Sequence, residues 1–235
     1  MSKAVTDRIW DNMVEVKGGI LRMGAEPEQG SDAGDYSERP VHFVKLDDFR
    51  ICRYPVTQGE WQALMGHNPS HFRGDPNLPV EMVSWDDAES FIVQLNSITS
   101  GGYRLPTVPE WEYAALGGEK TRGYKYSGGN LVDEVAWTVT NSNKMTHPVG
   151  QLTPNELGLF DMSGNLWEWC KDLYREYDAD TIRPRLSKWT AVHCREMRGG
   201  CWCNDPYAAR VKSRSSYYPV NRPFDTIGFR LAFQG

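Results

Sequence analysis

Long apolar runs are missing from this sequence of 235 residues. No stretch approaches the roughly 18 consecutive apolar residues that a membrane-spanning helix needs, so we expect no transmembrane segment. Residues 1–16 also lack the apolar centre of a signal peptide. That absence fits a cytoplasmic protein, and it equally fits a chain from which an export signal has been removed.

Clustered positive charge is missing as well. The 26 lysines and arginines are spread along the chain, and the formal net charge is −5. Domains that bind nucleic acid usually concentrate an excess of positive charge on one face. We therefore expect no nucleic-acid partner.

A regular cysteine framework is the third absence. The chain has five cysteines, an odd number, and they stand at positions 52, 170, 194, 201 and 203. Disulfide scaffolds use even sets of cysteines, and zinc knuckles use a Cys-x-x-Cys spacing that Cys201 and Cys203 do not have. The sequence predicts neither a disulfide scaffold nor a structural metal site.

Aromatic and turn-forming residues, in contrast, are abundant. The chain holds 9 Trp, 11 Tyr, 22 Gly and 14 Pro, which is typical of a loop-rich fold pinned by aromatic side chains rather than of a helical bundle. Residues 13–24 and 41–51 carry the short apolar alternation of half-buried strands.

Helix starts are indicated by three capping boxes. Thr57, Ser84 and Thr107 are each followed three residues later by an acidic residue, so side chain and backbone at the first turn satisfy each other. Gly101 is the expected stop of the middle helix. The expected helices cover residues 60–66, 86–102 and 109–118. We expect one α+β domain over 1–235, with two main helices, short antiparallel sheets and many loops.

Four segments carry a family resemblance. They are YPVTQGEWQALMG (54–66), RLPTVPEWEYAALGG (104–118), GLFDMSGNLWEWCKD (158–172), and the ending that runs from RGGCW (198–202) to IGFRLAF (227–233). Together they resemble the formylglycine-generating-enzyme/sulfatase-modifying-factor family, in order from about residue 13 to residue 233. The resemblance implies a C-type-lectin-like fold of the formylglycine-generating-enzyme type.

The resemblance leaves several functions open, because this scaffold hosts an oxidase, accessory domains and the variable proteins of diversity-generating retroelements. The oxidase carries two copper-binding cysteines five positions apart, and carried across they fall near Asn204 and Ala209, neither of which is a thiol. We therefore expect no enzyme activity and no catalytic residue. The alternatives are a copper- or thiol-dependent oxidase that uses Cys201 and Cys203, and a non-catalytic accessory domain.

Other metal or cofactor sites have little support in the sequence. His67 and His71 are four residues apart, but the Asn-Pro-Ser between them breaks any helix that would align them. Asn165 and Glu168 lie in an oxygen-rich loop of the kind that binds calcium in this fold. A turn held by the neighbouring tryptophans explains the same residues. We expect no cofactor, with structural calcium as the alternative.

The C-terminal segment, about 198–233, separates into two sets of positions. One set matches the family pattern and has structural explanations; it includes the arginines, Trp202 and the alternating apolar residues from Ile227 to Phe233, which predict a half-buried strand. The other set holds cysteine, aromatic and small polar residues. These twelve positions are Cys201, Cys203, Asn204, Asp205, Tyr207, Ser215, Ser216, Tyr217, Tyr218, Phe224, Asp225 and Thr226.

The residue types at the twelve positions favour variation and binding. In variable proteins of diversity-generating retroelements, adenine-directed mutagenesis converts asparagine codons into others that end in a pyrimidine, and such codons cannot encode Lys, Glu, Gln, Met or Trp. None of the twelve positions holds any of these five residues. Tyrosine supplies rigid contact area and Ser, Asn and Asp supply adaptable hydrogen bonds, so Tyr207, Tyr217, Tyr218 and Phe224 are candidate hot spots.

Two of these assignments have structural alternatives, which are of equal weight for Cys201, whereas binding is favoured for the tyrosines. Cys201, next to a large tryptophan, is explained as well by a small buried apolar side chain. Tyr217 and Tyr218 are neighbours in an expected strand, so they point to opposite sides and one of them can be buried. The sequence predicts a display protein that binds a protein or other macromolecule through this segment, and this role favours the cell surface over the cytoplasm.

Overall fold

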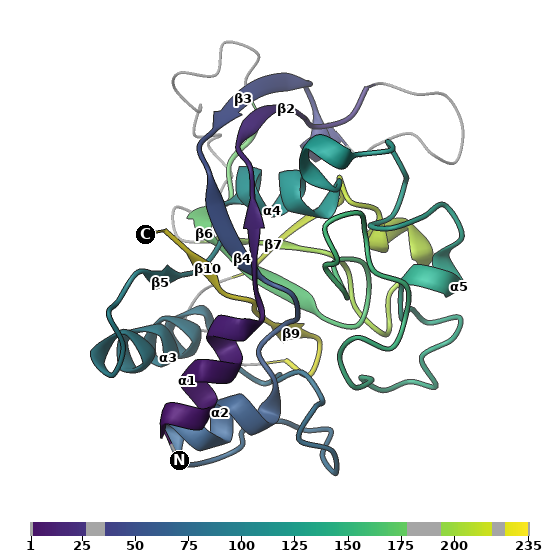
Figure 1. Cartoon of the computed structure of the whole chain (residues 1–235). Coiled ribbons are helices and arrows are strands. Elements are labelled where there is room, and N and C mark those ends of the chain that lie inside the picture. Colours follow the sequence, from purple (N-terminus) through teal and green to yellow (C-terminus); the bar gives the residue numbers. More distant parts are fainter. Residues whose placement is uncertain (1, 27–35, 178–193, 218–223, 235) are drawn as a thin grey trace.

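The structure is a computed structural model, and it describes residues 2–26, 36–177, 194–217 and 224–234. Figure 1 shows three helices, α1 to α3, gathered on one side of the molecule, with the β2–β3 hairpin at one end and a loop-rich region around α5 opposite the helices. The fold is α+β, as the sequence predicts.

Two sheets are built around the start of the chain. The first has the strand order β1-β4-β10-β5, and all of its described pairings are antiparallel. The second is the hairpin of β2 and β3. These strands are β1 (Met13–Val16), β2 (Gly19–Met23), β3 (His42–Leu46), β4 (Phe49–Cys52), β5 (Tyr103–Arg104) and β10 (Ala232–Phe233).

The third sheet carries the C-terminal segment. Its strand order is β8-β7-β6-β9, from β6 (Trp167–Leu173), β7 (Arg195–Arg198), β8 (Arg214–Tyr217) and β9 (Ile227–Gly228). The expectation of antiparallel sheets is wrong at one place, because β6 and β9 pair in parallel, with Trp167 opposite Ile227. The antiparallel strands β7 and β8 lie on one side of β6 in this sheet, and β9 lies on the other.

Three helices begin at the predicted capping residues. All three predicted capping boxes are present, with the side chains of Thr57, Ser84 and Thr107 accepting from the backbone N–H three residues on. They begin α2 (Gln58–Met65), α3 (Trp85–Ser97) and α4 (Val108–Ala115). The predicted stop at Gly101 is wrong, since α3 ends four residues earlier. The short helices are α5 (Val132–Val135), η1 (Tyr36–Glu38), η2 (Gly118–Lys120) and η3 (Pro206–Ala209).

The sequence analysis missed the first helix, α1 (Ser2–Asp11). Val5 and Ile9 are four residues apart and lie on one helix face. Ile9 is buried in the same core cluster as α2 and α3, and Val5 packs against that cluster. This pair was the available signal, but no capping residue marked the helix start.

Aromatic side chains fill the core between helices and sheets. Trp61 of α2 stacks on Phe91 of α3 at 5.4 Å between ring centroids, and Phe229 meets the Phe91 ring edge-on at 5.5 Å. A second cluster surrounds Trp111 of α4, which is fully buried beneath β2 and β4. The two clusters hold the third sheet in place from both sides.

The last strand differs from its prediction. Residues 227–233 form two short strands, β9 and β10, with an irregular stretch between them. Residues 227–232 are all buried, including Gly228 and Arg230, so this stretch has no solvent-facing side. The expected half-buried strand is wrong because a charged partner for Arg230 lies inside the core.

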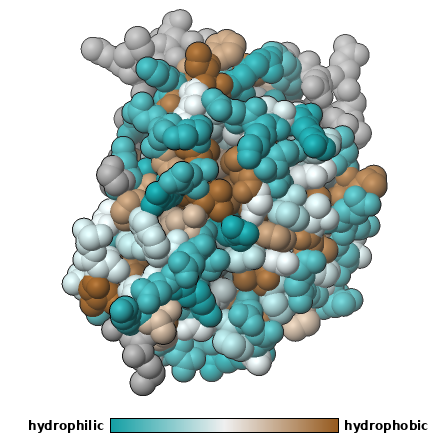
Figure 2. Space-filling model, in the orientation of Figure 1, coloured by the Kyte–Doolittle hydropathy of each residue, from teal (hydrophilic) through white to brown (hydrophobic). Residues whose placement is uncertain are grey.

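Hydrophilic side chains cover most of the face seen in Figure 2, interrupted by apolar groups. Among the described residues, no helix is both long and apolar enough to cross a bilayer.

Candidate binding surface

Buried arginines anchor the C-terminal segment to the rest of the molecule. Arg198, at the end of β7, is fully buried and pairs with Glu112 of α4 and Glu196 of its own strand. Its guanidinium also donates to the Val211 carbonyl at 3.1 Å. Since each charge has a partner, the cost of removing them from water is offset.

Arg230 makes the second anchor. Its guanidinium donates to both carboxylate oxygens of Glu168 in β6, at 2.7 and 2.6 Å. It also donates to the carbonyls of Cys52 and Phe160, so one side chain joins β9–β10, β6, β4 and the loop before β6. The Trp111 indole donates to Glu168 at 2.7 Å.

Glu168 was the candidate for structural calcium. Its two carboxylate oxygens are used by Arg230 and Trp111, and the side chain is buried. Asn165, the other candidate, accepts from the His147 backbone N–H and donates to the His147 carbonyl. Within the described ranges, no group of three or more His, Cys, Asp or Glu side chains is placed to hold a metal ion.

The residues after β7 form a tight turn. Asn204 N–H donates to the Cys201 carbonyl at 3.0 Å, and the Asn204 side-chain oxygen accepts from the Cys201 N–H at 3.2 Å. Cys201 and Cys203 therefore lie in a turn. Their two sulfurs are only 3.3 Å apart.

Trp202 ties this turn to the loop before β9. Its indole N–H donates to the Asp225 carbonyl at 2.9 Å, and Phe224 in the same loop meets the Tyr217 ring of β8 edge-on at 5.0 Å. Residues 224–226 therefore link the turn on one side to β8 on the other. The structure brings three separate parts of the predicted site together.

Most of the predicted site lies at the surface. Of the eleven described positions, four are exposed, six are partly exposed and one is buried. Tyr218 lies outside the described residues. The exposed positions are Cys203, Asp205, Tyr207 and Phe224, and the partly exposed ones are Asn204, Ser215, Ser216, Tyr217, Asp225 and Thr226.

Cys201 is the one described position of this set that the structure places in the interior. Its side chain is only 1% exposed, beneath the turn, so it does not reach a ligand directly. The alternative of a small buried side chain is the one that the structure supports. Cys201 nevertheless contacts the exposed Cys203, because the two sulfurs lie within hydrogen-bond distance, and the Cys201 thiol also donates to the Asn204 side-chain oxygen at 3.1 Å.

The thiol pair has an uneven electrostatic character. The hydrogen bond with Cys201 lowers the pKa of Cys203 to about 7, although partial burial and the Asp225 carboxylate oppose this shift. The same hydrogen bond, together with burial, raises the pKa of Cys201 well above its usual value. Near pH 7 about half of Cys203 is therefore thiolate, whereas Cys201 stays a thiol.

The positions that correspond to the catalytic cysteines of the oxidase have other roles here. Asn204 closes the turn through its side-chain oxygen. Ala209 is fully buried at the end of η3, where its carbonyl accepts from Ser163 at 2.7 Å. Neither position offers a metal ligand of the soft type that copper(I) prefers.

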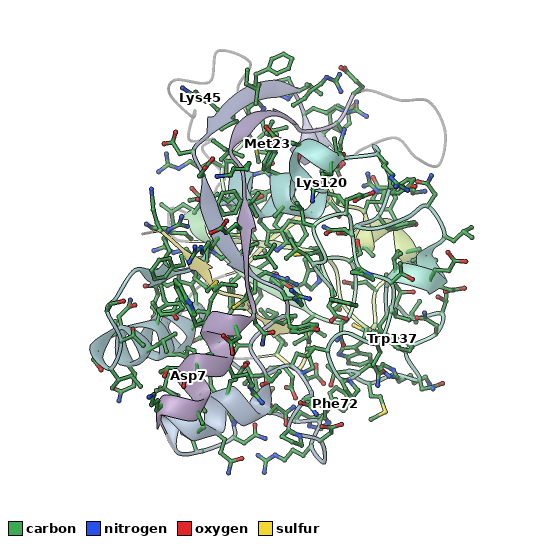
Figure 3. The ribbon with its side chains drawn as sticks, viewed as in Figure 1. Asp7, Met23, Lys45, Phe72, Lys120 and Trp137 are labelled. Carbon is green, nitrogen blue, oxygen red and sulfur yellow. The ribbon has the colours of Figure 1, made fainter. Side chains whose placement is uncertain are left out.

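Two further loops border the surface, and the sequence analysis missed both. Phe72 meets the Trp202 ring edge-on at 5.4 Å, and Val139 donates its N–H to the Asn204 carbonyl at 3.0 Å. Figure 3 shows Phe72 and Trp137 on the same side of the molecule, far from the β2–β3 hairpin. No sequence motif marks these residues, because only the fold brings them to the C-terminal segment.

The short sheets, the capped helices and the looped-out C-terminal segment define a C-type-lectin-like domain of the formylglycine-generating-enzyme type. A family model described as the sulfatase-modifying factor enzyme 1-like domain, FGE-sulfatase, matches residues 2–234. The chain belongs to this family.

Individual relatives differ in what they are called. The formylglycine-generating enzyme of Streptomyces coelicolor is 35% identical, over 97% of this chain and 91% of that protein. Chaperone protein LppX of Paenibacillus barcinonensis is 33% identical, over 86% of this chain and 82% of that protein. Among solved structures, Treponema denticola variable protein 1 is 29% identical with a TM-score of 0.79, and the superposition covers 95% of each chain.

Proposed function

We propose that this chain is a non-catalytic binding protein whose C-terminal segment presents a sequence-variable surface to a protein or other macromolecular ligand. The observation that carries the proposal is the division within that segment. Arg198 and Arg230 are buried and paired, whereas ten of the eleven described candidate positions reach the surface. Residues at these surface positions can therefore be substituted while the buried ion pairs of Arg198 and Arg230 are kept.

The chemistry of the surface suits contact with a macromolecule. Tyr207 and Phe224 are large side chains that are 39% and 37% exposed, and neighbouring Asn, Asp and Ser residues offer hydrogen bonds. Rigid aromatic anchors combined with small polar groups are characteristic of diversified binding sites. Tyr217, half-buried against Phe224, would support that anchor from the side.

The oxidase alternative has less support. The two positions that would carry catalytic thiols hold Asn204 and the buried Ala209. The similarity to Treponema denticola variable protein 1 and the pyrimidine-ending codon pattern both favour diversification by a retroelement. A display role of this kind suits the cell surface better than the cytoplasm.

The genomic test compares DNA. If the segment is diversified, the codons for residues 198–233 have a near-identical copy beside a reverse-transcriptase gene. The two copies differ mainly at adenines, and these differences fall on the twelve candidate positions. Absence of such a copy, or differences spread evenly over the segment, would contradict retroelement diversification.

The protein-level test uses a display library. The four exposed positions, Cys203, Asp205, Tyr207 and Phe224, are randomised with pyrimidine-ending codons, and the library is selected against hen lysozyme as a probe protein. We expect most members to stay folded and specific binders to be enriched. The matched control library randomises the same number of buried positions, including Arg198 and Arg230, and should lose folded display. If the first library also loses folded display, the surface is not replaceable and the proposal fails.

A further inference from the structure

The two cysteines of the turn lie close enough together to react with each other. Their sulfurs are 3.3 Å apart, while the sulfurs of a disulfide are about 2.05 Å apart. A movement of little more than 1 Å, within reach of side-chain rotation, separates the dithiol from the disulfide. All five cysteines of the chain are free thiols in this structure.

We propose that Cys201 and Cys203 are a thiol–disulfide exchange site, in which Cys203 attacks a low-molecular-weight disulfide and Cys201 resolves the mixed disulfide. The geometry assigns the two roles. Cys203 is exposed and meets a dissolved disulfide directly, whereas Cys201 is buried and reaches only Cys203. The proposal holds whether or not the surrounding surface binds a ligand.

The reaction balances with oxidised glutathione as the oxidant. The Cys203 thiolate attacks one glutathione sulfur, the glutathione S–S bond breaks, and one glutathione thiolate leaves and takes up a proton. Cys201 then loses its proton and attacks the Cys203 sulfur, which releases the second glutathione as a thiol. The protein loses two electrons and two protons, and the disulfide of glutathione is reduced to two thiols.

Local electrostatics supports the direction of attack. The thiolate is the nucleophile in this exchange, and the hydrogen bond with Cys201 lowers the pKa of Cys203 to about 7 despite the opposing Asp225 carboxylate. Burial raises the pKa of Cys52, Cys170 and Cys194 above their usual values. These three cysteines are therefore internal controls within the same molecule.

The central experiment measures the mass of one tryptic peptide. The protein is equilibrated in glutathione buffers of increasing oxidised fraction, quenched with N-ethylmaleimide under denaturing conditions and digested with trypsin. The peptide 199–210 contains both cysteines and no other. We expect it to change from the doubly alkylated form to an unalkylated form that lacks two hydrogen atoms, while the peptides of Cys52, Cys170 and Cys194 stay alkylated. Two alkyl groups at every ratio, or a stable glutathione adduct in the wild type, would overturn the proposal.

Two variants separate the roles. In Cys201→Ala the resolving thiol is missing, so we expect a glutathione adduct to accumulate on Cys203. In Cys203→Ser we expect Cys201 to stay unmodified in the folded protein, because it is buried. A melting curve checks that Cys201→Ala is folded. If this variant is unfolded, the mass of the wild-type peptide and the modification state of Cys203→Ser still test the proposal. Rapid glutathione addition to Cys201 in folded Cys203→Ser would reverse the assigned roles.

A rate comparison tests the attacking group. At pH 7 about half of Cys203 is thiolate, and because nucleophilicity falls together with pKa, we expect native alkylation of Cys203 to be about fivefold to tenfold faster than that of Cys194. The rate should level off above a midpoint near this pH. If Cys203 reacts no faster than Cys194, it is not the attacking thiol.

Discussion

At the scale of the residue, Asp161 shows how burial and hydrogen bonding compete. It adopts a left-handed backbone conformation with φ of 57°, and its carboxylate accepts from the Gly150 N–H at 2.8 Å. Burial raises the pKa of Asp161 to about 6, against the stabilising effects of this hydrogen bond and of Arg230. The folded protein therefore binds a proton at this carboxyl more tightly than the unfolded chain does.

The pH dependence of stability follows from that sign. The contribution of Asp161 is complete below its unfolded pKa of about 4 and is lost as the pH rises through about 6. Asn tolerates the left-handed conformation and stays neutral, so Asp161→Asn should gain about 2 to 3 kcal/mol relative to the wild type between about pH 4 and pH 7. Urea denaturation of both proteins across this range measures the difference. A difference that does not change with pH would contradict the prediction.

At the scale of the element, the turn at 201–204 and the short helix η3 are fitted together through Gly200. Its φ is 74°, and a Cβ there would lie 2.8 Å from the Ala208 carbonyl oxygen. The close approach of the backbones at Gly200 and Ala208 fixes the relative positions of Cys203 and Tyr207. Glycine is needed here for both its conformation and its lack of volume.

A matched pair of substitutions separates these two needs. Gly123 has a similar φ of 69° and no atom within 4 Å of its added Cβ, so Gly123→Ala should cost only the conformational strain, about 1 to 2 kcal/mol. Gly200→Ala adds a backbone clash and should cost roughly 2 to 5 kcal/mol in total. Thermal and urea unfolding measure both variants. Equal losses would mean that the close approach to η3 adds nothing.

Elements that are determined by residues close in sequence could be predicted from the sequence. Elements that depend on contacts between residues far apart in the chain could not. The helices α2, α3 and α4 were predicted because a capping box lies within four residues of sequence. The parallel pairing of β6 with β9 and the burial of Arg230 depend on Glu168, 62 residues away. The candidate binding surface divides in the same way: its C-terminal positions were predicted from the sequence, whereas Phe72 and Val139 border it only through folding.

At the scale of the whole molecule, one buried arginine connects the third sheet to the first. Arg230 lies near the C-terminus, and it donates to Glu168 in the third sheet and to the Cys52 carbonyl in the first. Both charged side chains are almost fully buried. Because the interior solvates an unpaired charge poorly, each partner is stable only in the presence of the other.

Removal of one partner should therefore affect the entire fold. Arg230→Met leaves Glu168 buried without its countercharge, and we expect a loss of about 3 to 5 kcal/mol in unfolding free energy. Lys17→Met is the control, since it breaks the exposed ion pair with Asp48 and should change the unfolding midpoint little. Chemical denaturation measures both. A loss for Arg230→Met as small as that of the control would show that Glu168 finds another partner.

Strand β10 lies inside its sheet, between β4 and β5. The sheet that contains β1, β4 and β5 is therefore complete only after Ala232–Phe233 has been synthesised. Strand pairing between such distant parts of the chain forms slowly. A ribosome has to translate all of the segment between β7 and β9 before the first sheet can close. A stop codon or a frameshift in that segment removes β10, and β4 and β5 then lack the strand that lies between them. Under the proposed diversification, folding would thus screen copies of the segment before any ligand meets them.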